Sequence, residues 1–264
     1  MEKQLPTFKI EGTLFLVDVY KGELREAQNP NNTISFEHME DKGKYYVIQY
    51  DPDDKNLPSR LNKPGVKEVE IPSMVNLDPQ GMADKYKIPV AFLKGKTDFE
   101  VLVDQDLFQQ RMSGKLPTID IAGHDYIIDL WLKELRPKDD VGSRIDLKTV
   151  DHSGDGEKYL FFYRPATKEV VEIEPTVLVL PKGVVLIEIP DEVKLDPVAV
   201  AQQYDMKVQD LVRQFPLEKN LVANIYPLSA TNLADMVKKN VEYSKQKQEK
   251  QPEPSKKKKR GLRL

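Results

Sequence analysis

The pattern of apolar and polar residues occurs twice along this chain, in the same order. Residues 5–25 align without gaps on residues 116–136, and nine of the 21 aligned positions are identical. In each copy a short apolar run, a glycine-containing turn and a longer apolar run follow one another, which predicts a β-hairpin. The predicted hairpin strands are Phe8–Ile10 and Leu14–Tyr20 in the first copy, and Ile119–Ile121 and Tyr126–Trp131 in the second.

Further strands are predicted after each hairpin, because β-branched and aromatic residues are concentrated there in short runs. Phe99–Val103 is predicted as one more strand. The second copy also has an additional run with the composition of a strand, Thr176–Leu180, where the first copy has the loop Pro58–Pro64. The paired runs are Thr33–Phe36, Tyr45–Tyr50 and Val66–Ile71 in the first copy, and Arg144–Leu147, Tyr159–Tyr163 and Val184–Ile189 in the second.

A second pair of matching segments changes the period from strand to helix. The tripeptide Leu77-Asp78-Pro79 recurs as Leu195-Asp196-Pro197, now offset by 118 residues instead of 111. An aspartate at the N-cap followed by proline at the first helical position is typical of a helix start. Two other helices are predicted at Gln105–Met112, where Gly114 ends the helix, and at Leu233–Tyr243.

Together these elements predict an α+β chain with two tandem duplicated modules. Each module is expected to be a mostly antiparallel sheet followed by short helices. A C-terminal helix and a disordered basic tail complete the chain. The predicted ranges are 1–114 for the first module, 115–237 for the second homologous module, and 238–264 for the end of the helix and the tail.

The composition limits the class of protein. Hydrophobic residues make up 39% of the 264 residues and charged residues 31%, and no run approaches the roughly 18 apolar residues that a membrane helix needs. No apolar run follows the first charges, so we expect no secretory signal, no membrane partner and a cytoplasmic location. The absence of cysteine excludes disulfides, thiol nucleophiles and cysteine-based metal sites. No cofactor is predicted.

The net charge of −3 conceals an uneven distribution. Residues 238–264 hold 11 of the 40 basic residues but only 3 of the 43 acidic ones, so an acidic body carries a basic tail. Such a tail predicts contact with nucleic acid or with an acidic protein partner, and a purely solubilising role is the alternative. The composition from Ser244 onward is typical of disorder. The predicted contact residues are Lys256, Lys257, Lys258, Lys259 and Arg260.

The segment after each Asp-Pro pair resembles the helix-turn-helix motif of DNA-binding proteins. Both copies share the pattern Ala-x-x-Tyr-x-[Ile/Met]-x-Val-x-x-Leu, which begins at Ala83 and at Ala201. A DNA-reading helix would lie in the major groove. Short helices that pack on a sheet are the competing interpretation. In the DNA-binding alternative, the candidate contacts are Lys94, Lys96, Lys207 and Arg213.

Other chemical motifs are incomplete. The run Asp151–Glu157 begins like a calcium loop, but Phe162 stands where the loop needs a bidentate glutamate. Lys94-Gly-Lys-Thr97 lacks the earlier glycine of a phosphate-binding loop, because position 90 is valine. None of the three histidines has a counterpart in the other copy. We therefore predict neither a metal site nor a catalytic triad.

The duplication permits one catalytic alternative. Asp18 and Asp129 occupy equivalent positions in apolar strands, and a shared site would make them a general acid and base. A local ion pair or amide contact for each aspartate is favoured instead. The sequence thus predicts a non-enzymatic binding protein, with DNA binding and carboxylate catalysis as alternatives. Trp131, the only tryptophan, is predicted to be largely buried at the end of its strand.

Overall fold

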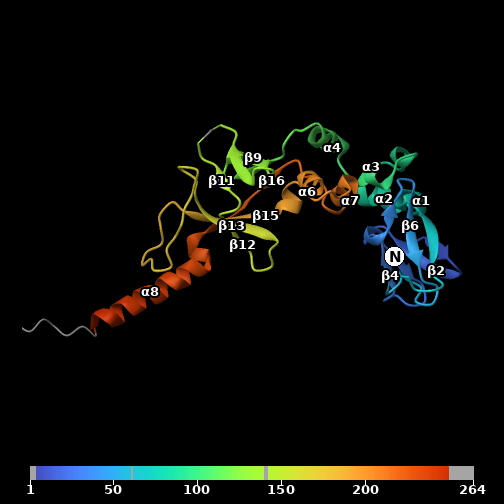
Figure 1. Ribbon diagram of the computed structural model, residues 1–264, viewed down its shortest axis with the longest axis horizontal. Coiled ribbons are helices and arrows are strands. Elements are labelled where there is room, and N and C mark those ends of the chain that lie inside the picture. The colour runs from blue at the N-terminus through green and yellow to red at the C-terminus, as the bar shows by residue number, and fades with distance from the viewer. Residues whose placement is uncertain (1–3, 61, 140–141, 250–264) are drawn as a thin grey trace, which may run out of the picture. The chain divides into compact units, whose positions relative to one another are not determined.

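The computed structural model describes residues 4–60, 62–139 and 142–249, which form two compact units (Figure 1). The first unit contains the chain up to Lys115 together with Glu192–Lys219. The second contains Leu116–Asp191 and the chain from Asn220 onward. Sheets and helices are both present, which confirms the α+β fold class. Among the described residues, no helix has the length and apolar character to cross a membrane.

The first unit has two antiparallel sheets over one core. Phe15 and Val17 from one sheet and Tyr46, Tyr50 and Ile71 from the other are buried in the same cluster. The four-stranded sheet has the order β1 (Thr7–Ile10), β2 (Thr13–Asp18), β3 (Glu23–Glu26), β4 (Thr33–Ser35). The three-stranded sheet has the order β5 (Glu40–Asp41), β6 (Tyr45–Tyr50), β7 (Lys67–Pro72).

Short helices complete the first unit. The aspartate N-caps are present as predicted: Asp78 accepts a hydrogen bond from the Gly81 amide at 2.7 Å, and Asp196 from the Ala199 amide at 3.1 Å. The helices are η1 (Phe36–His38), α1 (Met74–Leu77), α2 (Pro79–Tyr86), η2 (Val90–Leu93), α3 (Asp98–Leu102), α4 (Gln105–Met112), α5 (Glu192–Leu195), α6 (Pro197–Gln203) and α7 (Val208–Gln214).

The second unit also has two sheets. The first has the order β11 (Ile145–Asp146), β10 (Glu134–Pro137), β9 (His124–Asp129), β8 (Thr118–Ile121), β16 (Leu221–Val222), with β16 parallel to β8. The second has the order β12 (Asp151–His152), β13 (Lys158–Arg164), β15 (Val185–Pro190), β17 (Asn224–Pro227), and β14 (Glu169–Val170) also pairs with β13. The turn η3 (Leu228–Ala230) leads into α8 (Asn232–Glu249).

Matching segments adopt the same strand pairing in both units. Val17 lies opposite Leu24 in the first unit, and Ile128 lies opposite Leu135 in the second, with the same offset of 111 residues. Both hairpins turn through two residues with positive φ, at 45° and 87° for Glu11-Gly12 and at 55° and 83° for Ala122-Gly123. These angles match the twist of paired strands, so the same short turn sets the pairing in each hairpin.

The predicted strand Phe99–Val103 is wrong, because this segment forms the helix α3. The Thr97 hydroxyl accepts a hydrogen bond from the Glu100 amide at 3.3 Å, and the Glu100 carboxylate accepts one from the Thr97 amide at 2.7 Å. This reciprocal pair is a capping box, which starts a helix even when the residues that follow favour strands. The Thr-x-x-Glu spacing in the sequence could have indicated it.

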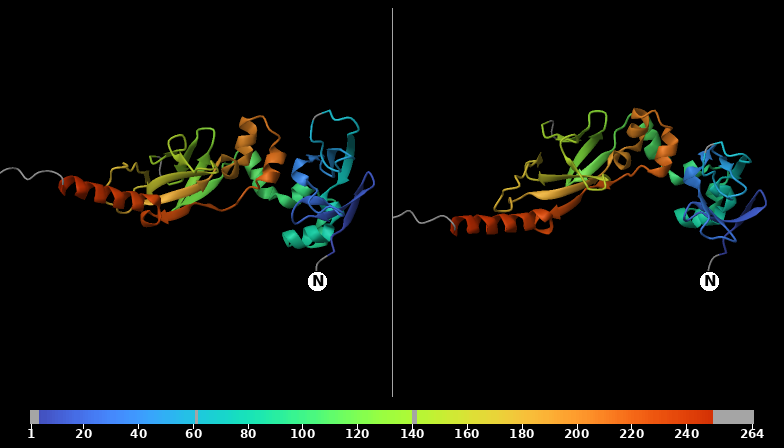
Figure 2. Two further views of the ribbon diagram at one scale, coloured as in Figure 1. Left: turned by 90° about the horizontal axis from the view of Figure 1, so that it is seen from below. Right: turned by 60° about the horizontal axis from the view of Figure 1, so that its bottom comes forward.

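The predicted strand at Thr176–Leu180 is also wrong, because this additional segment has no regular structure. Its Val177 and Leu180 side chains pack beside the buried Leu233 near the start of α8. Asn240 of α8 donates hydrogen bonds to the carbonyl oxygens of Pro175 and Val177, at 2.7 and 3.0 Å. Figure 2 shows α8 in red, beginning beside the sheets of the second unit and projecting away from them. Packing near a helix, rather than strand pairing, explains Val177 and Leu180, whereas Leu178 and Val179 of the same run are exposed.

The segment Glu192–Lys219 belongs to the first compact unit, although the predicted ranges assign it to the second module. Val198 of α6 and Val212 of α7 share a buried cluster with Val103 and with Phe108 of α4. Helix-to-helix packing therefore joins this later segment to the first unit, which local sequence patterns do not reveal.

Candidate functional site

A hollow lies at one edge of the second sheet in the second unit. Strand β15 pairs with one edge of β13, so β12 and β14 share the other edge, where they pair with opposite ends of β13. Between them, a hollow of about 710 Å³ is lined by residues from Thr149 to His152, Leu160 to Phe162 and Val170 to Pro175, together with Leu186. This hollow, called the slot below, falls within the volume range of ligand sites.

The inner surface of the slot contains an apolar pair that the first unit lacks. Phe162 lies opposite Leu186 across the β13–β15 pair. The corresponding positions of the first unit hold Gln49 and Glu68, which face each other across β6 and β7 and form a hydrogen bond of 3.2 Å. The second unit therefore presents an apolar pair where the first has a polar one.

The rim of the slot is acidic. Asp151, Glu172 and Glu174 line it and are exposed, and His152 lies beside them with its ring 4.5 Å from that of Tyr159. None of the described residues that line the slot is lysine or arginine. An apolar interior surrounded by carboxylates is complementary to a ligand that carries apolar and cationic groups.

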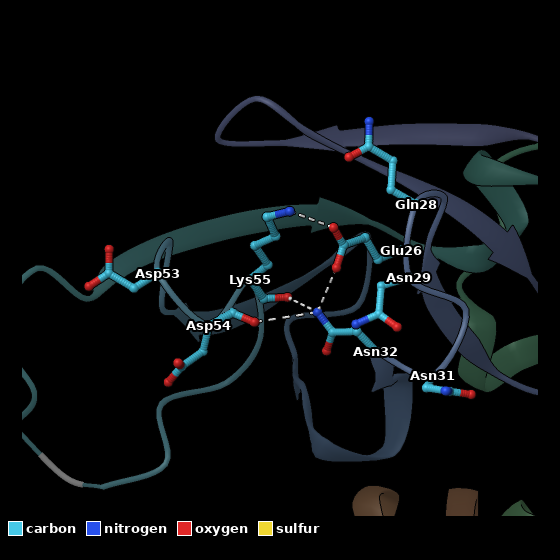
Figure 3. Close-up of a pocket in the computed structure, with 8 residues that line it drawn as sticks. All are labelled: Glu26, Gln28, Asn29, Asn31, Asn32, Asp53, Asp54 and Lys55. Carbon is cyan, nitrogen blue, oxygen red and sulfur yellow. Dashed lines mark hydrogen bonds and ion pairs between the residues drawn. The ribbon is translucent and has the colours of Figure 1, made fainter.

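A second pocket, of about 610 Å³, lies in the first unit and is polar (Figure 3). The Lys55 ammonium donates to the Glu26 carboxylate at 2.6 Å, and the Asn32 amide donates to it at 3.0 Å. These two hydrogen bonds, that from Lys55 foremost, lower the pKa of Glu26 below its ordinary value. Asn32 also donates to the Lys55 carbonyl oxygen at 3.1 Å. These contacts join two loops, so Glu26, Asn32 and Lys55 have a structural role.

Of the predicted basic contacts, only those of the DNA-binding alternative lie among the described residues. Lys256, Lys257, Lys258, Lys259 and Arg260 lie outside the described residues. Lys94 is exposed and Lys96 is half-buried, on the segment between η2 and α3.

The residues of the predicted DNA-reading helix are engaged within the first unit. Arg213 is only 9% exposed, forms an ion pair of 3.1 Å with Asp41 and lies over the ring of Tyr46. Lys207 donates to the Asp41 carbonyl oxygen at 3.2 Å. In the first copy, the expected second helix is the single turn η2. These contacts favour helices that pack on the unit over helices that read DNA.

Asp18 and Asp129 have equivalent local roles in their two units. Asp18 accepts a hydrogen bond from the Lys21 amide at 3.1 Å, and Asp129 accepts one from the Leu132 amide at 3.2 Å. Asp129 also forms an ion pair of 2.9 Å with Arg136. These contacts fix the β-turn after each strand. Among the described residues, no three histidine, aspartate or glutamate side chains are grouped to hold a metal ion.

Trp131 is 59% exposed, so the prediction that it is largely buried is wrong. The strand ends at Asp129, and the turn that follows directs Leu130 inward and Trp131 outward. An apolar run that continues through a turn no longer alternates between the two faces of a sheet, which is why the pattern was misleading. Exposed large aromatic side chains are frequent in contact surfaces.

We expect the fluorescence of Trp131 to resemble that of a solvated indole in the folded protein. Its emission maximum should shift little on unfolding, and acrylamide should quench it almost as efficiently before unfolding as after. The measurement is emission and quenching along a urea titration. A large red shift on unfolding would contradict the exposed position.

Comparisons of the chain with protein-family models, curated proteins and solved structures give no match. The slot is therefore the strongest indication of function that the molecule itself provides. The sequence pattern alone does not indicate the slot, because Leu160, Phe162 and Leu186 have the spacing of ordinary strand residues. The exchange of Gln49 and Glu68 for Phe162 and Leu186 between the aligned strands was the signal that could have revealed it.

Proposed function

We propose that the chain is a non-enzymatic binding protein built from two homologous modules. The slot is its binding site for an extended protein segment that carries apolar and cationic side chains. The observation that carries this proposal is the apolar pair Phe162–Leu186 inside a rim of Asp151, Glu172 and Glu174. The shape suits an extended ligand, because an extended segment presents alternate side chains on one face and can place them in an apolar hollow.

Features that the two modules share support the proposal of a common origin. They share the strand pairing of their hairpins and the aspartate caps of α2 and α6. We propose that the duplication left the hairpin and the aspartate-capped helix in both modules and that the second module acquired the slot. The apolar exchange, the additional loop Thr176–Leu180 and α8 all belong to the second unit.

A nine-residue peptide of alternating leucine and lysine should bind the full chain. We expect it to bind at least about tenfold more tightly than a leucine–glutamate peptide, a difference of about 1.4 kcal/mol. The double exchange Phe162→Gln with Leu186→Glu should abolish binding, because it installs the polar pair of the first unit. Calorimetry or fluorescence anisotropy measures both affinities.

The matched control is the reverse exchange in the first unit, Gln49→Phe with Glu68→Leu, which should leave peptide affinity unchanged. Circular dichroism checks that each variant is folded. Equal affinity for both peptides, or unchanged binding by the Phe162→Gln/Leu186→Glu variant, would rule out the slot as the binding site.

We further propose that the basic tail contacts nucleic acid or an acidic protein surface. A chain that ends at Glu249 keeps the contacts described above but loses Lys256–Arg260. It should lose most nucleic-acid binding at low salt, because phosphate contacts depend on clustered cations and weaken steeply with salt. Filter binding at several salt concentrations measures this loss. Tight binding of a defined duplex by the shortened chain would favour the helix-turn-helix alternative instead.

A further inference from the structure

We infer that the slot is occupied by the C-terminal segment of the same chain, residues 256–264. The inference rests on the proposed function of the slot as a binding site and names its ligand. The acidic partner of the basic tail is then the second module itself. While the segment occupies the slot, no other ligand can enter the slot and the tail cannot contact another molecule. A partner must therefore displace the segment before it can bind.

The chemistry of the segment matches that of the slot. Five consecutive cations, Lys256 to Arg260, are followed by Gly261, Leu262, Arg263 and Leu264. In an extended chain, side chains two positions apart lie on the same face. Leu262 and Leu264 can therefore enter the apolar interior together. Arg263 and the preceding cations then lie toward the carboxylates of Asp151, Glu172 and Glu174 at the rim.

The chain is long enough for this contact. Asn240 of α8 is hydrogen-bonded to Pro175, which itself lines the slot, so the helix passes beside the site. From Asn240 the helix carries the chain about 14 Å to Glu249 at 1.5 Å per residue. The following 15 residues span up to about 50 Å when extended, which is more than the distance back.

Attachment to the same chain makes even a weak contact effective. A tether of this length gives an effective concentration in the millimolar range. An affinity of about 100 μM for the free segment would then keep most slots occupied. Because the attraction is between exposed charges, occupancy should fall as salt is added.

The test uses the full chain with a spin label on the tail. The sequence contains no cysteine, so the substitution Gly261→Cys provides a single attachment point. The nitroxide should broaden the amide NMR signals of Phe162, Glu172 and Ile173 at low salt. Broadening should be several-fold weaker in the double variant Glu172→Gln/Glu174→Gln, and also in Leu262→Ser/Leu264→Ser.

The matched control is Glu70→Gln/Glu218→Gln, which removes two exposed carboxylates from the first unit and should leave the broadening unchanged. Absence of broadening at the slot would overturn the inference, as would broadening that survives the leucine substitutions. A further sample mixes isotope-labelled chains that lack the nitroxide with spin-labelled chains that lack the isotope. Broadening that appears only in this mixture would assign the slot to a second copy and overturn the intramolecular contact.

If the leucine–lysine peptide binds but the tail label has no effect, only this inference fails. If the peptide binds neither the full chain nor the chain that ends at Glu249, the proposed function fails.

Discussion

Replacing Asp98 with alanine is expected to lower the free energy of unfolding of the first unit by about 3–5 kcal/mol, because buried partners left without an acceptor cost about 1–3 kcal/mol each. Asp98 is 1% exposed. Its carboxylate accepts hydrogen bonds from the Tyr46 hydroxyl at 2.7 Å and from the Met74 and Val75 amides at 2.7 and 2.8 Å. It therefore caps α1 from a distant position in the chain.

The control for Asp98 is Asp104, which caps α4 at an exposed position by accepting from the Leu107 amide at 3.0 Å. Asp104→Ala should cost only about 1 kcal/mol, the usual value for a lost N-cap. Urea unfolding followed by circular dichroism compares the two variants. A loss for Asp98→Ala no larger than that for Asp104→Ala would contradict the role assigned to the buried carboxylate.

Asp98 should also make stability depend on pH. Desolvation by burial raises the pKa of Asp98 above its ordinary value of 3.8, against the opposing effect of its hydrogen bonds. Between the ordinary and the raised pKa, the folded chain binds more protons than the unfolded chain, so this group's contribution to stability falls as pH rises. As pH rises through that window, the unfolding free energy of the parent should fall relative to that of the Asp98→Asn variant. A constant difference from pH 3 upward would contradict the raised pKa.

The local elements of this fold follow from short patterns, whereas the site depends on contacts between distant residues. The hairpin turn at Glu11-Gly12 and the Asp78-Pro79 helix start are determined by neighbouring residues, and both are present as predicted. Burial at a turn, as at Trp131, depends on where the strand ends. The carboxylate of Asp98 is buried by residues far from it in the chain, so local periodicity contains no information about it.

The slot shows the same limit at the level of function. Its interior requires Phe162 and Leu186 to face each other. This pairing can be predicted from the alignment of the two pairs of strands. Its rim requires Glu172 and Glu174 to leave the sheet beside β12, and the path of that segment is determined by packing against α8. The chemistry of the residues was visible in the sequence, but their convergence was not.

The ion pair between Arg111 and Asp196 is expected to be the strongest single link between α6 and the rest of the first unit. Arg111 of α4 donates to the Asp196 carboxylate through Nε at 2.9 Å and through Nη2 at 2.8 Å. The two side chains are 8% and 0% exposed. Arg111→Ala leaves the carboxylate buried without its cation, which typically costs about 3–5 kcal/mol.

The first unit supplies a control, because Lys42 and Glu40 form an ion pair at an exposed position. Lys42→Ala should leave the free energy of unfolding almost unchanged, because solvent-exposed pairs contribute little to stability. Trp131 lies in the second unit, so its fluorescence does not report on α6. Amide hydrogen exchange in α4 and α6 does, and protection there should fall in Arg111→Ala but not in Lys42→Ala. Protection in Arg111→Ala no lower than in Lys42→Ala would mean that apolar packing by Val198 and Val212, rather than the ion pair, holds these helices together.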